Sequence, residues 1–299
     1  MNPVIPFRPR WPIRALRYLP GSTNLKFRRY GKLVKAFSGR RRLARTYFGG
    51  AMLCDIEDFT AGFIYHFGIW EPHISAFVAD RLRPGDAFCD IGANIGYYSL
   101  LASRAVGPRG VVIAVDPSPP IFAILLENLA FNGARNVRTV QAAVAAQAGK
   151  IALYRGPSWN SGMTTTLANH GFKATDEVDA LPLEDILRPD EIARLRLIKI
   201  DVEGAEAPIL ESLLGRIADF PPEMEIIAEL AFSEDASHSA ILQGLVERFA
   251  AAGYSAFELL NTYDARSYMK FGGVIAPFAL KLPPTTQKDV LFSRHYSGS

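Results

Sequence analysis

The sequence Asp-Ile-Gly-Ala-Asn-Ile-Gly at residues 90–96 constrains the fold of this chain more than any other segment. It follows a short apolar run at 87–89 and leads into a helix-like stretch at 95–105. This order predicts a buried strand, a turn that contains glycine, and a helix. Gly92 and Gly96 lack side chains where a ligand can approach the backbone, and the helix N-terminus offers free N–H groups. We therefore expect a ligand site at this turn.

A second acidic position indicates what kind of ligand the turn holds. A predicted strand at 111–115 ends in Asp116-Pro117, and Asp116 lies 26 residues after Asp90. An acidic residue at the end of the second strand suits a hydrogen bond to the hydroxyl groups of a ribose. The expected site therefore holds a cofactor that contains a nucleoside.

The residues of the turn distinguish between two classes of cofactor. Nicotinamide-binding turns have the pattern G-x-G-x-x-G, whereas here Asn94 lies between Gly92 and Gly96. The carboxylate of Asp90, just before the turn, repels a pyrophosphate but attracts an amine. These features favour S-adenosylmethionine, which carries an ammonium group and no phosphate. The alternative is that Asp90 and Asn94 only stabilise the turn, with Asn94 capping the helix.

Predicted strands alternate with predicted helices after this turn, which implies a parallel sheet covered on both faces. Residues 55–70 are rich in aromatic side chains and are predicted to form a small hairpin over the mouth of the site. Residues 155–180 are polar and rich in turn residues, and we expect them to face the substrate. The other expected strands cover 137–144, 151–154, 195–202, 224–230, 255–259 and 289–293, and the expected helices 72–83, 95–105, 119–132, 183–187, 205–214 and 240–251.

A second group of charged residues follows a predicted buried strand. Lys199 and Asp201 share one face of this strand because side chains alternate with a period of two. Asp201, Glu203 and Glu206 lie near the N-terminus of the next helix, and Glu229 ends the following strand. Ligands bind beyond the carboxyl ends of the strands in such sheets, so these residues are candidates for an active site. The alternative is a structural network in which Lys199 neutralises Asp201 and the glutamates cap the helix.

Five segments of the chain share their content, order and spacing with one protein family: DIGANIGYYSLLAS, VVIAVDPSP, ENLAFNG, LIKIDVEGAE and IIAEL. Together with the upstream Glu71-Pro72, they resemble the FkbM family of S-adenosylmethionine-dependent methyltransferases over about residues 58–230. The resemblance implies an α/β, Rossmann-like class I methyltransferase fold. That fold has a mainly parallel seven-stranded sheet with an antiparallel last strand and helices on both faces. The resemblance also implies O-methylation of a small molecule or of a sugar or glycan.

The residues and the resemblance together give candidate roles. We expect S-adenosylmethionine to be bound by Glu71, Asp90, Gly92, Asn94, Gly96, Asp116, Pro117 and Ala142. Asp201 is the first candidate for the carboxylate that accepts the proton of the acceptor, with Glu203 and Glu229 next. None of the five histidines lies in a motif, and His170 is the one to test as a base. No set of His, Cys and acidic residues has metal-ligand spacing, so we predict no required metal.

Charge is distributed unevenly along the chain. Residues 1–50 hold 13 Lys or Arg and no acidic residue, whereas the remainder holds 20 basic and 30 acidic residues. We therefore divide the chain into a basic N-terminal extension, 1–54, with one or two short helices within 14–46, and a methyltransferase domain, 55–299. The cofactor half of that domain covers about 85–154. The extension is either an arm that makes weak contact with an anionic surface or nucleic acid, or a solvated tail that packs on the acidic domain.

Two rival functions differ from methylation of a small-molecule or glycan hydroxyl. The first is methylation of nucleic acid with the basic extension as a phosphate-binding arm. Against it, no N-P-P-Y segment follows the strand at 195–202, so a nucleic-acid substrate is not expected. The second is binding of S-adenosylmethionine without catalysis. No apolar run is long enough to cross a membrane, and the two cysteines give no disulfide framework, so we expect a cytoplasmic protein.

Overall fold

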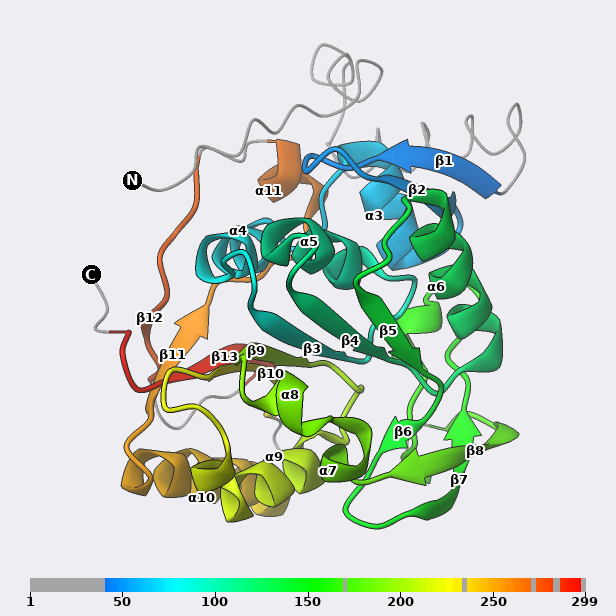
Figure 1. Ribbon diagram of the computed structural model, residues 1–299. Coiled ribbons are helices and arrows are strands. Elements are labelled where there is room, and N and C mark those ends of the chain that lie inside the picture. The colour runs from blue at the N-terminus through cyan, green and yellow to red at the C-terminus, as the bar shows by residue number, and fades with distance from the viewer. Residues whose placement is uncertain (1–40, 169–170, 233–235, 270–272, 282–285, 297–299) are drawn as a thin grey trace.

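The computed structural model describes residues 41–168, 171–232, 236–269, 273–281 and 286–296 (Figure 1). Its centre is a sheet with the strand order β12-β11-β13-β10-β9-β3-β4-β5. Within this sheet β10, β9, β3, β4 and β5 run parallel to one another. Strand β13 is antiparallel to both β10 and β11. The bounds are β3 (Ala87–Ile91), β4 (Val111–Val115), β5 (Val137–Val140), β9 (Leu195–Ile200), β10 (Glu225–Leu230), β11 (Ser255–Leu259), β12 (Phe278–Ala279) and β13 (Lys288–Ser293).

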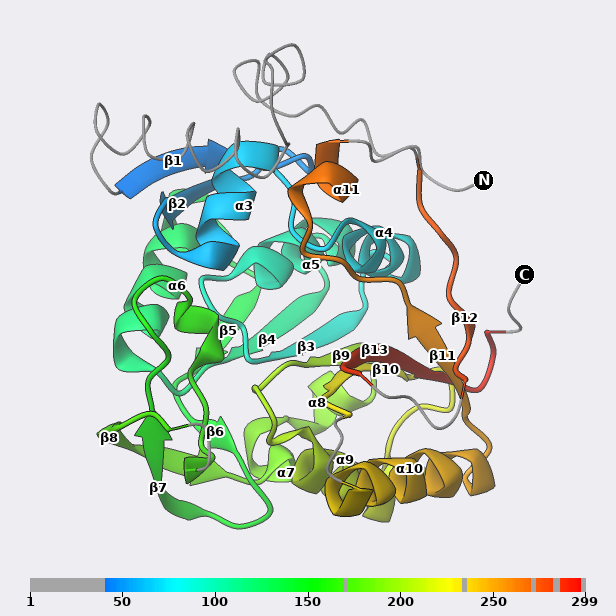
Figure 2. The ribbon, with the colours of Figure 1, turned by 180° about the vertical axis from the view of Figure 1, so that it is seen from behind.

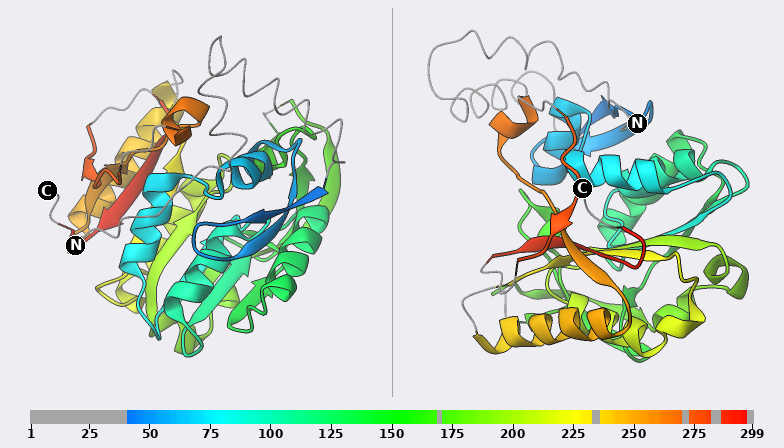
Figure 3. Two further views of the ribbon diagram at one scale, coloured as in Figure 1. Left: turned by 90° about the horizontal axis from the view of Figure 1, so that it is seen from above. Right: turned by 90° about the vertical axis from the view of Figure 1, so that its left-hand side faces the viewer.

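Helices cover both faces of this sheet, as Figures 1 and 3 show. One face carries α3 (Phe59–Phe67), α4 (Pro72–Arg81), α5 (Tyr97–Val106), α6 (Pro119–Phe131) and α11 (Ala265–Met269). The other carries α7 (Leu183–Ile186), α8 (Pro189–Ile192), α9 (Glu206–Gly215) and α10 (Ala236–Ala251). Alternating strand residues serve the two cores: Phe88 belongs to the first and Cys89 to the second. The fold is therefore the predicted Rossmann-like class I arrangement of seven strands, extended at one edge by the two-residue β12.

Two small sheets flank the central one. A hairpin of β1 (Arg41–Arg45) and β2 (Ala51–Asp55) lies against α3 and α6, where Asn128 and Asn132 accept hydrogen bonds from its backbone. The second sheet has the order β6-β8-β7. Its strands are β6 (Ala143–Val144), β7 (Gly149–Tyr154) and β8 (Ala174–Leu181).

Most predicted elements are confirmed, but several predictions are wrong. Residues 55–70 do not form a hairpin: Asp58 accepts a hydrogen bond from the N–H of Ala61 and caps α3, which ends at Gly68 in the left-handed conformation. The strand expected at 137–144 divides into β5 and β6, which belong to different sheets. No strand was expected in the insertion 155–180, but most of β8 lies there and pairs with β7 along its length.

The proposed division of the chain at residue 54 falls within β2. Residues 41–45, which lie in the stretch expected to be helical, form a strand instead. Since the hairpin packs on α3 and α6, residues 41–54 lie with the methyltransferase domain. Most of the basic extension and His170 lie outside the described residues. Within the described residues, no helix has the length and apolar character needed to cross a membrane.

Candidate functional site

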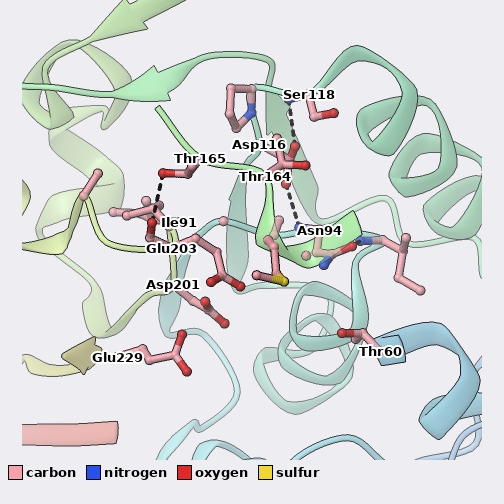
Figure 4. A pocket seen from close by; sticks show the side chains of 18 of the residues that line it. Thr60, Ile91, Asn94, Asp116, Ser118, Thr164, Thr165, Asp201, Glu203 and Glu229 are labelled. Atoms are coloured by element: carbon pink, nitrogen blue, oxygen red, sulfur yellow. Dashed lines mark hydrogen bonds between the residues drawn. The ribbon is translucent and has the colours of Figure 1, made fainter. Parts of the chain in front are cut away.

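A cavity of about 400 Å³ lies at the carboxyl ends of β3, β4, β9 and β10. Its volume is in the range of small-molecule sites. The turn after β3, Asp116 after β4, and Asp201 after β9 all line it. These residues meet because parallel strands bring their carboxyl ends to one edge of the sheet. Figure 4 shows Asp116 on one side of the cavity and the carboxylates that follow β9 and end β10 on another.

Asp116 has the surroundings expected of a ribose-binding carboxylate. One oxygen accepts a hydrogen bond from the Ser118 N–H and the other from the Asn94 N–H, both at 2.9 Å (Figure 4). Burial raises the pKa of this carboxyl group to about 7. Beside it, the buried Ser118 hydroxyl has no hydrogen-bond partner among the described residues. A carboxylate with spare lone pairs and an unpartnered hydroxyl, both at the cavity wall, fit the diol of a nucleoside.

The glycines of the turn are required by the protein itself rather than by a ligand. A Cβ on Gly92 would lie 1.8 Å from the carbonyl oxygen of Asp201, and one on Gly96 would lie 2.6 Å from Leu125. Gly92 lines the cavity, but Gly96 does not. Gly92 therefore lies where a ligand can approach, and Gly96 makes room for α6, while cofactor contact at both glycines stays a prediction.

Asp90 is not among the residues that line the cavity, and its predicted attraction for the amine of the cofactor stays a prediction. Its carboxylate is buried beneath the turn and accepts a hydrogen bond of 2.5 Å from the Ser99 hydroxyl. Burial raises the pKa of Asp90 to about 6, opposed by the Ser99 hydrogen bond and the charge of Lys199. Its position fits the alternative of stabilising the strand and turn. Asn94 lines the cavity, and its side chain accepts a hydrogen bond from the Ile95 N–H at 2.8 Å. It does not cap α5 as the alternative supposed, because the N-cap residue of that helix is Gly96.

The other predicted cofactor residues, Glu71, Pro117 and Ala142, line the cavity. Glu71 is buried at the start of α4 in the left-handed conformation, with φ of 42°. Its carboxylate accepts hydrogen bonds from the hydroxyls of Tyr98, at 2.7 Å, and Tyr263, at 2.9 Å. Such a fixed carboxylate is an anchor for a neighbouring polar ligand group.

The three candidate catalytic carboxylates gather at one place. Asp201, Glu203 and Glu229 each offer an oxygen, and these oxygens lie within 4.8 Å of one another (Figure 4). Lys199 donates to Asp201 at 2.7 Å and is itself buried. The expectation that no acidic set has ligand spacing for a metal is therefore wrong, because the fold joins residues from two strand ends. Whether the reaction requires a metal stays a prediction.

Burial and mutual repulsion alter the acid strength of this group. Burial, with the charges of Asp201 and Glu206, raises the pKa of Glu203 to about 8. Burial and the neighbouring acids also raise the pKa of Glu229 well above its ordinary value. Glu203 has a φ of 56°, which is uncommon for a residue with a side chain. Glu206 instead accepts bonds from the N–H groups of Val202 and Gly204, which is the structural role left open for it.

An aromatic wall of the cavity combines two rings from the predicted stretch 55–70 with a third that the sequence did not indicate. Trp70 and Tyr263 stack with ring centroids 5.3 Å apart, and Phe59 meets both rings edge-on. All three line the cavity, as does Gln287, which donates to Glu229. The aromatic content of 55–70 was a signal for two of the rings. No local signal pointed to Tyr263 or Gln287, which approach the cavity from segments after β11 and before β13.

Comparison with known proteins identifies the family of this chain. The profile of the methyltransferase FkbM domain matches residues 90–256. The methyltransferase sdnD of Sordaria araneosa is 30% identical over 153 residues, which cover 42% of this chain and 59% of that protein. The 31-O-demethyl-FK506 methyltransferase FkbM of Streptomyces tacrolimicus is 30% identical over 178 residues, covering 50% and 67%. The chain thus belongs to the FkbM family of methyltransferases, and its cofactor is S-adenosylmethionine.

Proposed function

We propose that this protein transfers the methyl group of S-adenosylmethionine to a hydroxyl oxygen of a small molecule or sugar. The proposal rests on one observation: the carboxylates of Asp201, Glu203 and Glu229 line the same cavity as Asp116. A base beside a methyl donor is what an alcohol acceptor needs, because its proton must leave as the new bond forms. By its name, the relative FkbM also acts on a small molecule, 31-O-demethyl-FK506.

The residues of the chain have separate tasks in this reaction. When bound, the cofactor supplies a methyl group on a sulfonium sulfur. Asp116 and Ser118 hold its ribose, and Glu71 and the turn after β3 hold its other polar groups. The aromatic wall of Phe59, Trp70 and Tyr263 excludes water and orients the acceptor. These residues would hold the acceptor oxygen in line with the donated methyl group, and a carboxylate of the cavity would receive the proton of the acceptor.

Glu203 is the best-placed residue to take the proton of the acceptor. A pKa of about 8 lies close to neutral pH, so the minor ionised fraction of Glu203 is present there and is basic enough to accept a proton. Asp201 is the first candidate from the sequence, but its oxygen is paired with Lys199 at 2.7 Å. We therefore assign Asp201 to orienting the acceptor hydroxyl and Glu203 to accepting its proton. Glu229 completes the acidic wall.

The charge of the cavity favours an uncharged acceptor over nucleic acid. Phosphates entering beside Asp201, Glu203 and Glu229 would meet repulsion, with Lys199 the only Lys or Arg among the described lining residues. The contact of the basic extension with an anionic surface stays a prediction.

The test is transfer of labelled methyl from S-adenosylmethionine to a panel of glycosides, other polyhydroxy compounds, and RNA and DNA. We expect label in an uncharged hydroxyl compound. Glu203→Gln should bind the cofactor like the wild type, while transfer falls about 10²–10⁴-fold, the usual range for loss of acid–base catalysis. Label in nucleic acid would refute the proposal. Cofactor binding with no transfer to any of these acceptors or to a cell extract would favour the binding protein.

A further inference from the structure

A segment of the insertion, residues 157–163, lies against the start of α3 and beside the cavity. Figure 2 shows the connection from β7 to β8 rising from the small sheet toward α3. The Phe59 N–H donates to the carbonyl of Trp159 at 2.8 Å. The N–H and hydroxyl of Ser161 both donate to Asp58 Oδ2, at 2.7 and 2.6 Å. One buried carboxylate thus holds a segment that lies 103 residues away in the chain.

The same carboxylate also starts α3. Asp58 Oδ1 accepts a hydrogen bond of 2.9 Å from the Ala61 N–H, which is the usual N-cap contact. The two oxygens therefore have different tasks: Oδ1 fixes the helix and Oδ2 fixes the segment. Bonds to a charged acceptor are stronger than bonds between neutral groups, so the segment is held firmly at this point.

The held segment lies directly on the cofactor turn. A Cβ on Gly162 would lie 3.4 Å from the side-chain nitrogen of Asn94 and 3.7 Å from the Thr60 hydroxyl. Asn160, Gly162 and Met163 line the cavity beside Asn94. The backbone of the segment thus forms a wall of the cofactor cavity.

A third attachment ties the chain just after the segment to β7 and to the backbone of Glu203. Thr165 pairs with Tyr154 through two backbone bonds, and its hydroxyl donates to the carbonyl of Glu203 at 2.9 Å. Residues 157–163 are therefore fixed by the hydrogen bonds to Asp58, and the chain that follows them is fixed by the bonds of Thr165. A change at Asp58 leaves the Thr165 end in place.

We propose that Asp58 is a positioning residue of the cofactor site. It holds residues 157–163 over the cavity, and the bonds between Asp58 and Ser161 must break for S-adenosylmethionine to enter or leave. This role concerns cofactor exchange, so it does not depend on which acceptor is methylated.

The test separates the two tasks of Asp58. In Asp58→Ser the short hydroxyl still caps α3 but does not reach Ser161. Ser161→Ala removes one of the two bonds, and Ser161→Thr keeps both donors. We measure association and dissociation rates of S-adenosylmethionine by stopped flow. Dissociation should rise roughly tenfold or more in Asp58→Ser, rise less in Ser161→Ala, and stay near the wild-type rate in Ser161→Thr. Association should rise as well, because the segment opens more often.

Asp86→Ser is the matched control. Asp86 accepts a bond from the Arg83 N–H at 2.7 Å in a turn before β3, so its loss weakens a similar contact away from the cavity. Melting temperatures of all variants identify general destabilisation. Wild-type exchange rates in a folded Asp58→Ser would overturn the proposal, as would an equal rise in Asp86→Ser. If Asp58→Ser does not fold, the Ser161 pair decides: equal rates in Ser161→Ala and Ser161→Thr would refute the role.

Discussion

Ser118 has a hydroxyl group that a bound ligand could satisfy but that the protein alone leaves without a hydrogen bond. Its buried hydroxyl lies at the cavity and has no partner among the described residues, whereas its backbone N–H is bound to Asp116. Desolvating such a hydroxyl without a bond costs free energy, which a ribose hydroxyl would recover.

We predict that Ser118→Ala weakens cofactor binding without lowering stability. Affinity should fall by about 0.5–1.5 kcal/mol, the net value of one hydrogen bond. Asp116→Asn is the companion variant, with a loss of about 1.5–3 kcal/mol for a charged acceptor. Calorimetry and melting curves on both variants give the answer. Wild-type affinity in both would remove this edge of the cavity from the cofactor site.

The acidic cluster is expected to work without a metal ion. Lys199 pairs with Asp201, and the Gln287 side chain donates to Glu229. These contacts already occupy carboxylate oxygens that a cation would need. We predict that Mg²⁺, Mn²⁺ and a chelator leave the melting temperature unchanged. A rise with one cation, lost in Glu229→Gln, would show that the cluster binds it.

The predicted bounds of helices and strands agree best with the structure where a segment is buried along its whole length. The strand at Val111–Val115 has the predicted bounds because a continuous apolar run between turns has few alternatives. The stretch 55–70 was misread because Gly62 and Gly68 suggested turns. Gly62 lies inside α3, where a Cβ would meet the Ile56 carbonyl at 3.3 Å. The cap at Asp58 was the available signal for the helix.

Only part of the residues that line the cavity could be predicted from the sequence, and the reason is physical. Residues next to strand ends, such as Asp116 and Asp201, are placed by the sheet, so their local sequence predicts them. Tyr263 reaches Glu71 across 192 positions of chain, through a contact that exists only after the sheet has formed. Asp90 lies near the end of β3, as the sequence indicates, but its side chain is buried against Ser99 and does not line the cavity. Sequence alone does not give the direction of such a side chain.

The C-terminal end of α3 gives a prediction at the element scale. Gly68 has a φ of 73°, and a Cβ there would lie 2.8 Å from the Arg45 carbonyl in β1. Gly133 has a φ of 61° and no atom within 4 Å of its Cβ position. Gly133→Ala should cost about 1 kcal/mol for the left-handed backbone, and Gly68→Ala about 2–3 kcal/mol, because its Cβ also displaces β1. Urea unfolding of both variants checks this, and equal costs would contradict the contact.

The whole molecule keeps several acids buried, and its stability should depend on pH accordingly. Burial raises the pKa of Asp90 to about 6, of Asp116 and Glu206 to about 7, and of Glu203 to about 8. The folded state then binds protons more tightly than the unfolded state, so its stability falls as pH rises through these values.

We predict that the melting temperature of the cofactor-free protein declines from about pH 5 to about pH 8. Glu203→Gln removes the group with the highest of these values, so its decline should be shallower between pH 7 and pH 8. Melting curves across this range on both proteins provide the measurement. A melting temperature that rises with pH would show that the buried acids are compensated by other groups.

The position of β13 determines when the molecule can be completed during synthesis. This strand lies between β10 and β11 and pairs with both, so each of them keeps an open edge until residues 288–293 arrive. A nascent chain therefore carries two open strand edges on the ribosome, and we expect chaperones to bind it at this stage. Protease resistance of ribosome-stalled chains should appear only once Ser293 has left the exit tunnel.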